Sequence, residues 1–537
     1  MTTSSRGWAA ALAIALGAGL TGCATAQRSA KVNVEGRSIT ELSRELAAGT
    51  TTSAALVDAY LERIERLDRS GPELRSVLAV NPDARAQARA LDAERAAGKS
   101  RGPLHGVPLL IKDNIETADA LPTTAGSLAL AENRNGRDAP LVARLRDAGA
   151  VILGKANLSE WANIRSTHST SGWSALGGVT RNPHALDRNA CGSSTGSGVA
   201  VAASLAAGAV GTETDGSITC PASLNGVVGL KPTVGLVSRT HVVPISHSQD
   251  TAGPMTLTVA DAALMLAALA GSDPADAATR EADARKRDYV AALDAGALRG
   301  RRVGVMRWRT GDLPAVDALF ERALQTLREG GAELVDIAAS GVPEELGALE
   351  LEILLTELRA DLDAYLATTG AAVKVRTLGD VIAFNQANAA ELSLFGQDLF
   401  EKAAATKGLS DPKYVEALAR ARRMAGEDGI DRLLKEHRVS VLVGPSYGPA
   451  WMTDLVNGDQ TLDGSSSQLP AVSGYPHLSV PMGAVKGLPV GLSFIGPAWS
   501  EAELLACGHA YEQLSRARPT PTYATGAAVG LPVKGAR

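Results

Sequence analysis

One stretch of this sequence must be buried in the interior of the folded protein. Residues 197–208 are almost all Ala, Val, Gly and Ser, so a helix formed by them has no polar face to turn toward water. The chain must therefore build a core around this helix. With 537 residues and near-neutral mean hydropathy, the chain is long enough for one large core or for two to three ordinary domains.

Short apolar runs that resemble buried strands alternate with helical patterns at both ends of the chain. The candidate strands are 107–111, 150–153, 439–443, 478–480 and 492–495. Between them, residues 271–440 are charged, rich in Glu, Arg and Leu, and helical in pattern, with one strand predicted at 302–307. We therefore predict one α/β sheet whose sequence is interrupted by a helical excursion at about 271–440.

The first 23 residues are typical of a lipoprotein signal peptide. Arg6 precedes a mostly apolar run at 8–20, which is too short to cross a bilayer as a helix. The run ends in LTGC at 20–23, which resembles the bacterial lipobox, where the cysteine (here Cys23) is diacylated and becomes the new N-terminus. An ordinary signal peptide with a chance cysteine is the alternative. We expect residues 24–37 to form a tether and 38–537 the folded domain, with a capping box that opens a helix at Ser38.

The charge pattern offers no support for nucleic-acid binding. The formal net charge is -5, and no polybasic run occurs. The signal peptide predicts a protein of the cell envelope that faces away from the cytoplasm and contacts the membrane only through its lipid anchor. The sequence does not determine the oligomeric state.

Three cysteines remain after Cys23, namely Cys191, Cys220 and Cys507, and an odd count excludes a fully paired disulfide framework. A bridge between Cys191 and Cys220 stays open, but we expect both to be small, buried packing residues. No Cys/His spacing predicts a metal site.

Two segments rich in Ser and Gly hold the candidate chemistry: residues 191–198 (CGSSTGSG) and 211–217 (GTETDGS). Taken singly, each could be an ordinary loop. The first also matches the G-x-S-x-G elbow of α/β-hydrolases, with Ser194 as nucleophile, but the preceding residues 181–189 have a loop pattern where an elbow needs a strand. Ser410 and Lys413 match S-x-x-K, yet Pro412 interrupts the pattern and no Lys-Thr-Gly occurs.

Taken together, the two segments resemble those of the amidase-signature family. The usual pattern there is Gly-Gly-Ser-Ser-Gly-Gly-Ser, a helix of small residues, and then Thr-Asp-x-Gly-Gly-Ser-Ile. Ser193 and Ser217 lie 24 residues apart (193 to 217), as in the family, and residues 108–114 (PLLIKDN) match the segment that supplies its lysine. The resemblance covers nearly all of the chain after residue 37 and implies a single large domain, with a mostly parallel or mixed sheet covered by helices on both faces.

The resemblance also implies the roles of the site residues. Ser217 would be the nucleophile, Ser193 the proton relay, held by a cis peptide bond, and Lys112 the final base, with no metal or organic cofactor. The backbone N–H groups of Thr214, Asp215, Gly216 and Ser217 would form the oxyanion hole, and Cys191, Gly192 and Ser194 would support the site. Lys112 must be neutral to accept a proton, and burial at the end of an apolar strand lowers a lysine pKa from about 10.4. We expect the adjacent Asp113 to point away from it.

Three departures from the usual pattern look like those of the bacterial peptide amidases, which release ammonia from C-terminal carboxamides. They are Cys191 in place of Gly, Thr195 in place of Gly, and Glu213-Thr214-Asp215-Gly216 in place of Asp-x-Gly-Gly. The expected partner is therefore a peptide amide or small-molecule amide. One alternative is an amidase that acts on fatty or other small amides. The others are an amidotransferase component that feeds ammonia to charged tRNA, and a non-catalytic lipid-anchored binding protein.

Overall fold

The computed structural model describes residues 1–4, 32–461 and 464–527. Cys23 and nearly all of the predicted signal peptide lie outside the described residues, as does most of the tether. In the part of the chain that is described, no helix combines the length and apolar character that a bilayer crossing requires.

One mixed sheet forms the centre of the molecule and agrees with the predicted fold class. Its strands, in spatial order, are β1 (Val77–Val80), β3 (Val151–Ala156), β2 (Pro108–Lys112), β6 (Gly208–Glu213), β8 (Thr251–Thr256), β7 (Val228–Lys231), β12 (His477–Val485), β13 (Leu488–Ile495), β11 (Val441–Pro445), β9 (Arg302–Met306) and β10 (Glu333–Ile337). The pairs β3–β2–β6 and β11–β9–β10 are parallel, and the other neighbouring pairs are antiparallel. A second, two-stranded sheet pairs β4 (Trp173–Ser174) with β5 (Gly178–Val179).

Helices cover both faces of the large sheet. The helices of the described residues are α1 (Ile39–Ala47), α2 (Ser53–Arg63), α3 (Ala84–Ala96), α4 (Pro140–Asp147), α5 (Thr195–Ala202), α6 (Thr219–Asn225), α7 (Val259–Leu269), α8 (Ala282–Arg285), α9 (Pro314–Glu329), α10 (Leu346–Ala367), α11 (Leu378–Ala387), α12 (Asp398–Ala404), α13 (Pro412–Ala425), α14 (Arg432–His437), α15 (Gln468–Ser473) and α16 (Glu501–Ser515). Helices α5 and α6 contact each other and the central strands, whereas α7, α9 and α16 pack together against the sheet.

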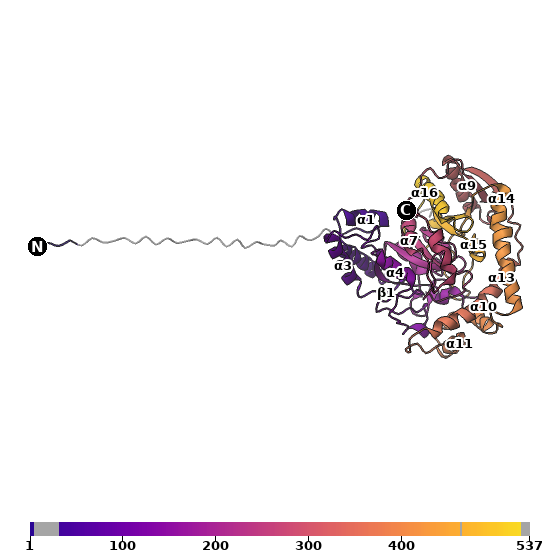
Figure 1. The fold of residues 1–537 in the computed structure, drawn as a ribbon, viewed down its shortest axis with the longest axis horizontal. Helices are drawn as coiled ribbons and strands as arrows, with labels where there is room; N and C mark the ends of the chain where they lie inside the picture. The colour runs from indigo at the N-terminus through magenta and orange to yellow at the C-terminus, as the bar shows by residue number, and fades with distance from the viewer. Residues whose placement is uncertain (5–31, 462–463, 528–537) are drawn as a thin grey trace, which may run out of the picture.

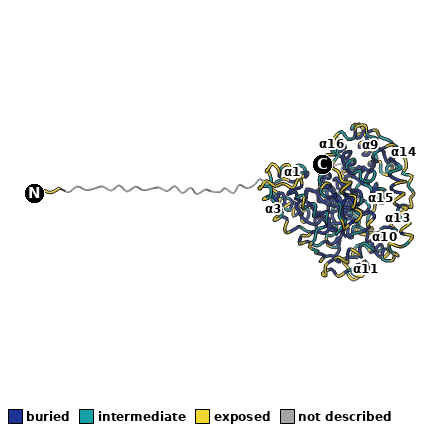
Figure 2. Tube along the Cα trace, viewed as in Figure 1, coloured by how far each residue is buried: buried dark blue, intermediate teal, exposed yellow. Residues whose placement is uncertain are grey.

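The N-terminal helices and the middle segment lie at opposite ends of the molecule. In Figure 1, the indigo helices α1 and α3 stand at one end, and α10, α13 and α14 of the middle segment stand at the other. The buried trace in Figure 2 runs through the sheet between them, while the outer turns of α3 and α13 are exposed. Most buried apolar side chains of the sheet and its covering helices form one large cluster, and four smaller clusters accompany it in the described residues.

The predicted small-residue helix is α5, and every one of its residues is buried. A side chain at Gly196 would place a Cβ 2.3 Å from the carbonyl oxygen of Ser76 and 2.5 Å from that of Asn157. Glycine is therefore required where this helix meets the neighbouring backbone. The helix ends at Ala202, earlier than the pattern predicted, and Gly208 already begins strand β6.

Local patterns predicted the N-terminal helix well, and the middle segment less well. Ser38 caps α1 and forms the reciprocal capping box with Glu41. In the middle segment, β9 matches the predicted strand, but β10 was missed. Both strands extend the central sheet, so the segment at 271–440 is not purely helical.

Candidate active site

Lys112 is the last residue of β2, between β3 and β6 in the sheet, and its side chain is fully buried. Its Nζ lies 2.8 Å from the Ser193 Oγ, 2.8 Å from the Thr212 Oγ1 and 3.2 Å from the Thr212 carbonyl oxygen. Burial lowers the lysine pKa to about 7, although the negative charges of Asp250 and Glu213 oppose the shift. A substantial fraction of Lys112 is therefore neutral near neutral pH.

Asp113 does not supply the counter-charge for Lys112. Its Oδ1 lies 2.9 Å from the Nζ of the buried Lys155, and its Oδ2 accepts hydrogen bonds from Thr124. The carboxylate is thus paired with a different lysine, as expected from the need to keep Lys112 neutral.

Ser193 lies between Lys112 and the second catalytic segment. A cis peptide bond joins Gly192 to Ser193, and the Ser193 side chain is fully buried. The Ser193 carbonyl accepts a hydrogen bond from the Ser159 amide at 3.0 Å. The hydroxyl lies beside the lysine amine and away from solvent.

Ser217 follows β6 in a tight turn and lines a cavity of about 280 Å³. Gly216, just before it, has φ +78°, and a Cβ there would lie 2.0 Å from the Tyr447 hydroxyl, so this position demands glycine. The Ser217 carbonyl accepts a hydrogen bond from the Ser194 amide at 3.0 Å. Among the described residues, no hydrogen bond joins the Ser217 hydroxyl to another side chain; catalytic hydrogen bonds frequently tighten only with substrate in place.

The turn that leads to Ser217 contains amide groups that no protein acceptor satisfies among the described residues. The Glu213 carboxylate fixes the far side of the turn by accepting hydrogen bonds from the amides of Ile218 at 2.7 Å and Thr219 at 2.9 Å. Within the described ranges, the amides of Asp215, Gly216 and Ser217 donate to no protein acceptor. Such free donors could stabilise negative charge that develops on a carbonyl oxygen.

Ser194 has a structural position. Its hydroxyl donates to the Thr212 carbonyl at 2.9 Å and accepts from the Thr212 amide at 3.1 Å, and its side chain is fully buried. No strand leads into it, contrary to a nucleophile elbow. The other alternative also fails, because Lys413 is exposed and pairs with Glu352 at 2.7 Å.

Cys191 and Cys220 form a disulfide, so the expectation of two separate packing residues was wrong. Cys191 precedes Ser193 by two residues, and Cys220 follows Ser217 by three. The bridge therefore fastens the loop of one serine to the helix that follows the other, and the Cys220 amide also donates to the Gly216 carbonyl at 2.8 Å. Spacing along the chain could not reveal this proximity. Cys507 is free and buried.

The cavity at Ser217 has walls from six separate parts of the chain. Its lining includes Asn163, Ile164, Ser171, Cys191, Gly192, Thr214, Asp215, Gly216, Cys220, Ile245, Leu354, Tyr447, Trp451 and Asp459. Asp459 accepts hydrogen bonds from the Ser171 amide at 3.0 Å and the Trp451 Nε1 at 3.2 Å. None of the lining residues that the structure describes is basic, so this cavity offers no cation for a substrate carboxylate.

Sequence patterns did not identify several residues that hold the site. Thr212 contacts Lys112, and the Thr214 hydroxyl donates to the Asp250 carboxylate at 2.6 Å. Thr212 and Thr214 lie within the second motif, so their position in that motif was a signal that could have indicated both residues. Asp250 lies in a loop that is distant in the sequence, and its only sequence signal is its position just before β8.

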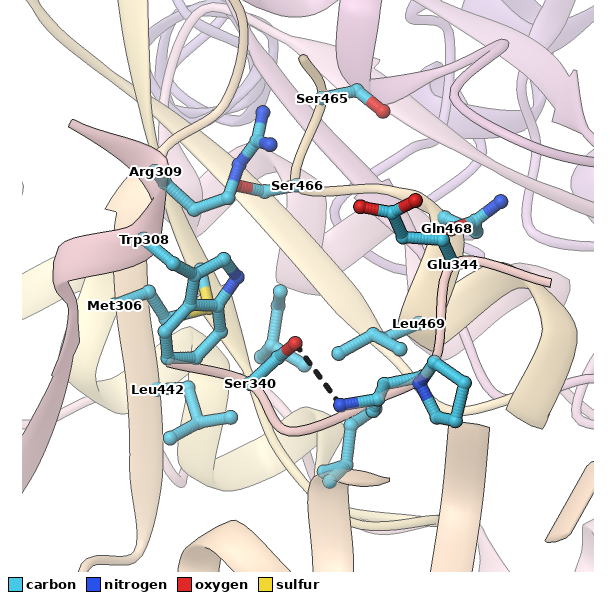
Figure 3. A pocket seen from close by; sticks show the side chains of 14 residues that line it. Met306, Trp308, Arg309, Ser340, Glu344, Leu442, Ser465, Ser466, Gln468 and Leu469 are labelled. Atoms are coloured by element: carbon cyan, nitrogen blue, oxygen red, sulfur yellow. Dashed lines mark hydrogen bonds between the residues drawn. The ribbon is translucent and has the colours of Figure 1, made fainter. Parts of the chain in front are cut away.

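A second cavity, of about 230 Å³, lies beside strands β9, β11 and β13 (Figure 3). Trp308, Leu442 and Leu469 supply apolar walls, and Arg309 and Gln468 add polar groups. This cavity contains none of the predicted catalytic residues. Gln468 nevertheless connects its wall to the first site, because the Gln468 Nε2 donates a hydrogen bond to Glu350 at 3.0 Å.

His247, Glu357 and Asp361 are close enough together to suggest a metal site. However, the His247 Nδ1 faces the Asp361 Oδ2 at 2.9 Å, and its Nε2 faces the Glu357 Oε1 at 3.4 Å. The imidazole itself bridges the two carboxylates, which accounts for the cluster without an ion.

Comparisons with known proteins agree with this geometry. A family model described as Amidase matches residues 55–505. The native peptide amidase from Stenotrophomonas maltophilia is a similar solved structure, with 50% identity and a TM-score of 0.84, covering 90% of this chain and 98% of that chain. A probable amidase of Arabidopsis thaliana is 41% identical over 88% of both chains. One component of the glutamyl-tRNA(Gln) amidotransferase of Roseiflexus castenholzii is 39% identical, covering 88% of this chain and 94% of that relative.

Proposed function

This chain belongs to the amidase family and is an amide-hydrolysing enzyme, and we propose that it works through Ser217, Ser193 and Lys112 on C-terminal peptide amides. The observation that carries the proposal is the 2.8 Å contact between the fully buried Lys112 amine and the Ser193 hydroxyl, beside a cavity lined by Ser217. A buried, largely neutral lysine is a competent proton acceptor.

In the proposed reaction, the Ser217 Oγ attacks the amide carbonyl while its proton passes to Ser193, and Ser193 passes a proton to Lys112. The carbonyl oxygen becomes negatively charged and is stabilised by the amides of the turn at Asp215 to Ser217. The C–N bond then breaks, and the relayed proton returns to the leaving nitrogen, which departs as ammonia. Water enters, loses a proton along the same relay and hydrolyses the ester to regenerate Ser217.

The lining of the cavity favours substrates whose acyl group carries no carboxylate near the scissile amide. Its lining contains Asp215 and Asp459 but, within the described residues, no basic side chain. A carboxylate placed there would lose its hydration without gaining a counter-charge. The C-terminal residue of a peptide amide has no free α-carboxylate, whereas free glutamine does, so this feature favours peptide amides over the glutamine used as an ammonia donor.

The substrate proposal is tested by ammonia release from a panel of equal-length amides. We expect the largest kcat/KM for an N-acylated dipeptide amide with an apolar C-terminal residue and little turnover of free glutamine. Fatty amides and free amino-acid amides serve as comparisons. Preferential turnover of a fatty amide or of glutamine would contradict the peptide assignment while leaving amide hydrolysis intact.

We further propose that the enzyme is lipid-anchored in the cell envelope through Cys23, on the support of the apolar run and the LTGC segment. Cys23→Ser should leave an unlipidated precursor whose apolar segment is retained. Mass spectrometry of the N-terminus and detergent partitioning measure the two effects. Processing of the unchanged chain that resists globomycin would show that the cysteine occurs by chance.

A further inference from the structure

The turn before Ser217 is in contact with a carboxyl group from the middle segment. Glu350, near the start of α10, is only 6% exposed. Its Oε1 accepts a hydrogen bond from the Gln249 Nε2 at 2.9 Å, and its Oε2 accepts one from the Gln468 Nε2 at 3.0 Å. The negative charge of Glu350 also acts on the Asp215 carboxyl. Glu350 thus joins three segments that are far apart in the sequence.

These contacts reach the backbone of the turn itself. The Gln249 Nε2 lies 3.4 Å from the Thr214 carbonyl oxygen, so the amide that binds Glu350 also contacts the turn. Asp215, which lines the cavity, supplies one of the free amides of this turn. The directions of these amides depend on the turn, and the turn is therefore braced by Glu350 from outside the two serine segments.

Burial favours the protonated form of both carboxyls. Burial raises the pKa of Asp215 well above its usual range, and the negative charge of Glu350 raises it further. Burial also raises the pKa of Glu350, while the hydrogen bonds from Gln249 and Gln468 oppose this shift. Of the two carboxyls, Asp215 therefore has the stronger tendency to keep its proton, because ionisation would place its charge close to that of Glu350. The other titratable groups whose charge acts on Asp215 or that feel its charge are Glu213, Lys231 and Tyr447.

We propose that Glu350 is a positioning residue for the turn before Ser217, and that it acts through Gln249, whose amide binds both Glu350 and the Thr214 carbonyl. The proposal rests on the proposed function of Ser217. Loss of the Asp215 proton at high pH would place a second negative charge beside the point where the substrate oxygen becomes negative. Activity should therefore rise as Lys112 loses its proton and then fall again in the alkaline range.

The test compares the unchanged enzyme with Glu350→Gln, Glu350→Ala and the control Glu352→Ala. Glu352 lies on the same helix, but it pairs with the exposed Lys413 rather than with the turn. Each protein is followed across the acid and alkaline ranges by ammonia release from the best amide and by the rate of labelling with a fluorophosphonate. Labelling requires an active serine and its oxyanion donors but no particular amide, so a wrong substrate assignment does not affect it.

We expect Glu350→Ala to lower kcat and the labelling rate about tenfold to a hundredfold, because small misplacements of reacting groups cost rates of this order. Glu350→Gln removes the negative charge beside Asp215 but keeps a side chain that can form hydrogen bonds, so it should retain most activity at neutral pH. Burial still raises the pKa of Asp215 in this variant, but the charge of Glu350 no longer adds to the shift, so the alkaline decline should move to lower pH. Glu352→Ala should match the unchanged enzyme.

Folded Glu350→Ala protein with an unchanged labelling rate would overturn the proposal. So would a change confined to KM, which would limit Glu350 to a role in substrate binding, or an alkaline decline at an unchanged pH in Glu350→Gln. If the unchanged enzyme released ammonia but preferred another amide over peptide amides, only the peptide assignment would fail. If it took up no fluorophosphonate at all, the role of Ser217 and this proposal would fail together.

Discussion

Lys112→Met should leave a folded protein that has lost nearly all amide hydrolysis. Methionine keeps much of the length and apolar packing of the lysine stem but removes the amine that lies 2.8 Å from the Ser193 hydroxyl. Without that acceptor, Ser193 cannot pass its proton on, and we expect kcat to fall at least about a thousandfold, within the range of general acid–base contributions. Ammonia release and thermal unfolding of the same preparation measure activity and folding separately.

The pH dependence of the unchanged enzyme gives a second measure of the same residue. The Lys112 pKa lies at about 7, below its ordinary value of 10.5, so the neutral form increases as pH rises through that value. Activity should therefore increase from the acid side and level off above neutral pH, before any alkaline decline from the carboxyl pair. Lys413→Met, which alters an exposed lysine, is the matched control and should behave as the unchanged enzyme does. Near-normal turnover by folded Lys112→Met would contradict the role of Lys112.

Ser217→Ala should abolish labelling by a serine-directed fluorophosphonate and reduce kcat on the order of 10⁶-fold, as losses of a catalytic serine do elsewhere. The physical reason is that Ser217 supplies the atom that forms the acyl-enzyme and lines the cavity. Labelled peptides identified by mass spectrometry, together with ammonia release, measure the effect.

Ser194→Ala is the matched control for the nucleophile. It removes two hydrogen bonds to the backbone of Thr212, which costs about 1–3 kcal/mol of stability when buried partners are left unsatisfied. Labelling should remain detectable because Ser194 has no access to the cavity. Labelling that disappeared only in Ser194→Ala would instead restore the nucleophile-elbow interpretation.

Local sequence patterns were sufficient for elements whose stability is decided within a few residues. The capping box at Ser38 and Glu41 forms α1 through bonds between near neighbours. The apolar run that ends at Lys112 is β2, and the helix of small residues is α5, because burial is already implied by side chains that cannot face water. Lys112, Ser193 and Ser217 were indicated by the resemblance to the amidase-signature family and not by local patterns.

Tertiary structure decided which distant segments meet. Strand β10 was missed because its half-exposed residues carry a weak pattern, and it is stabilised by pairing with β9. The Cys191–Cys220 bridge depends on the close approach of two loops, with Cα atoms 5.9 Å apart. Glu350 on α10 is linked to the turn through Gln249, a residue 101 positions away in the sequence that the fold brings next to it. A charged residue in a helical pattern has the same local sequence whether it faces solvent or a buried carboxyl, so its role follows from packing alone.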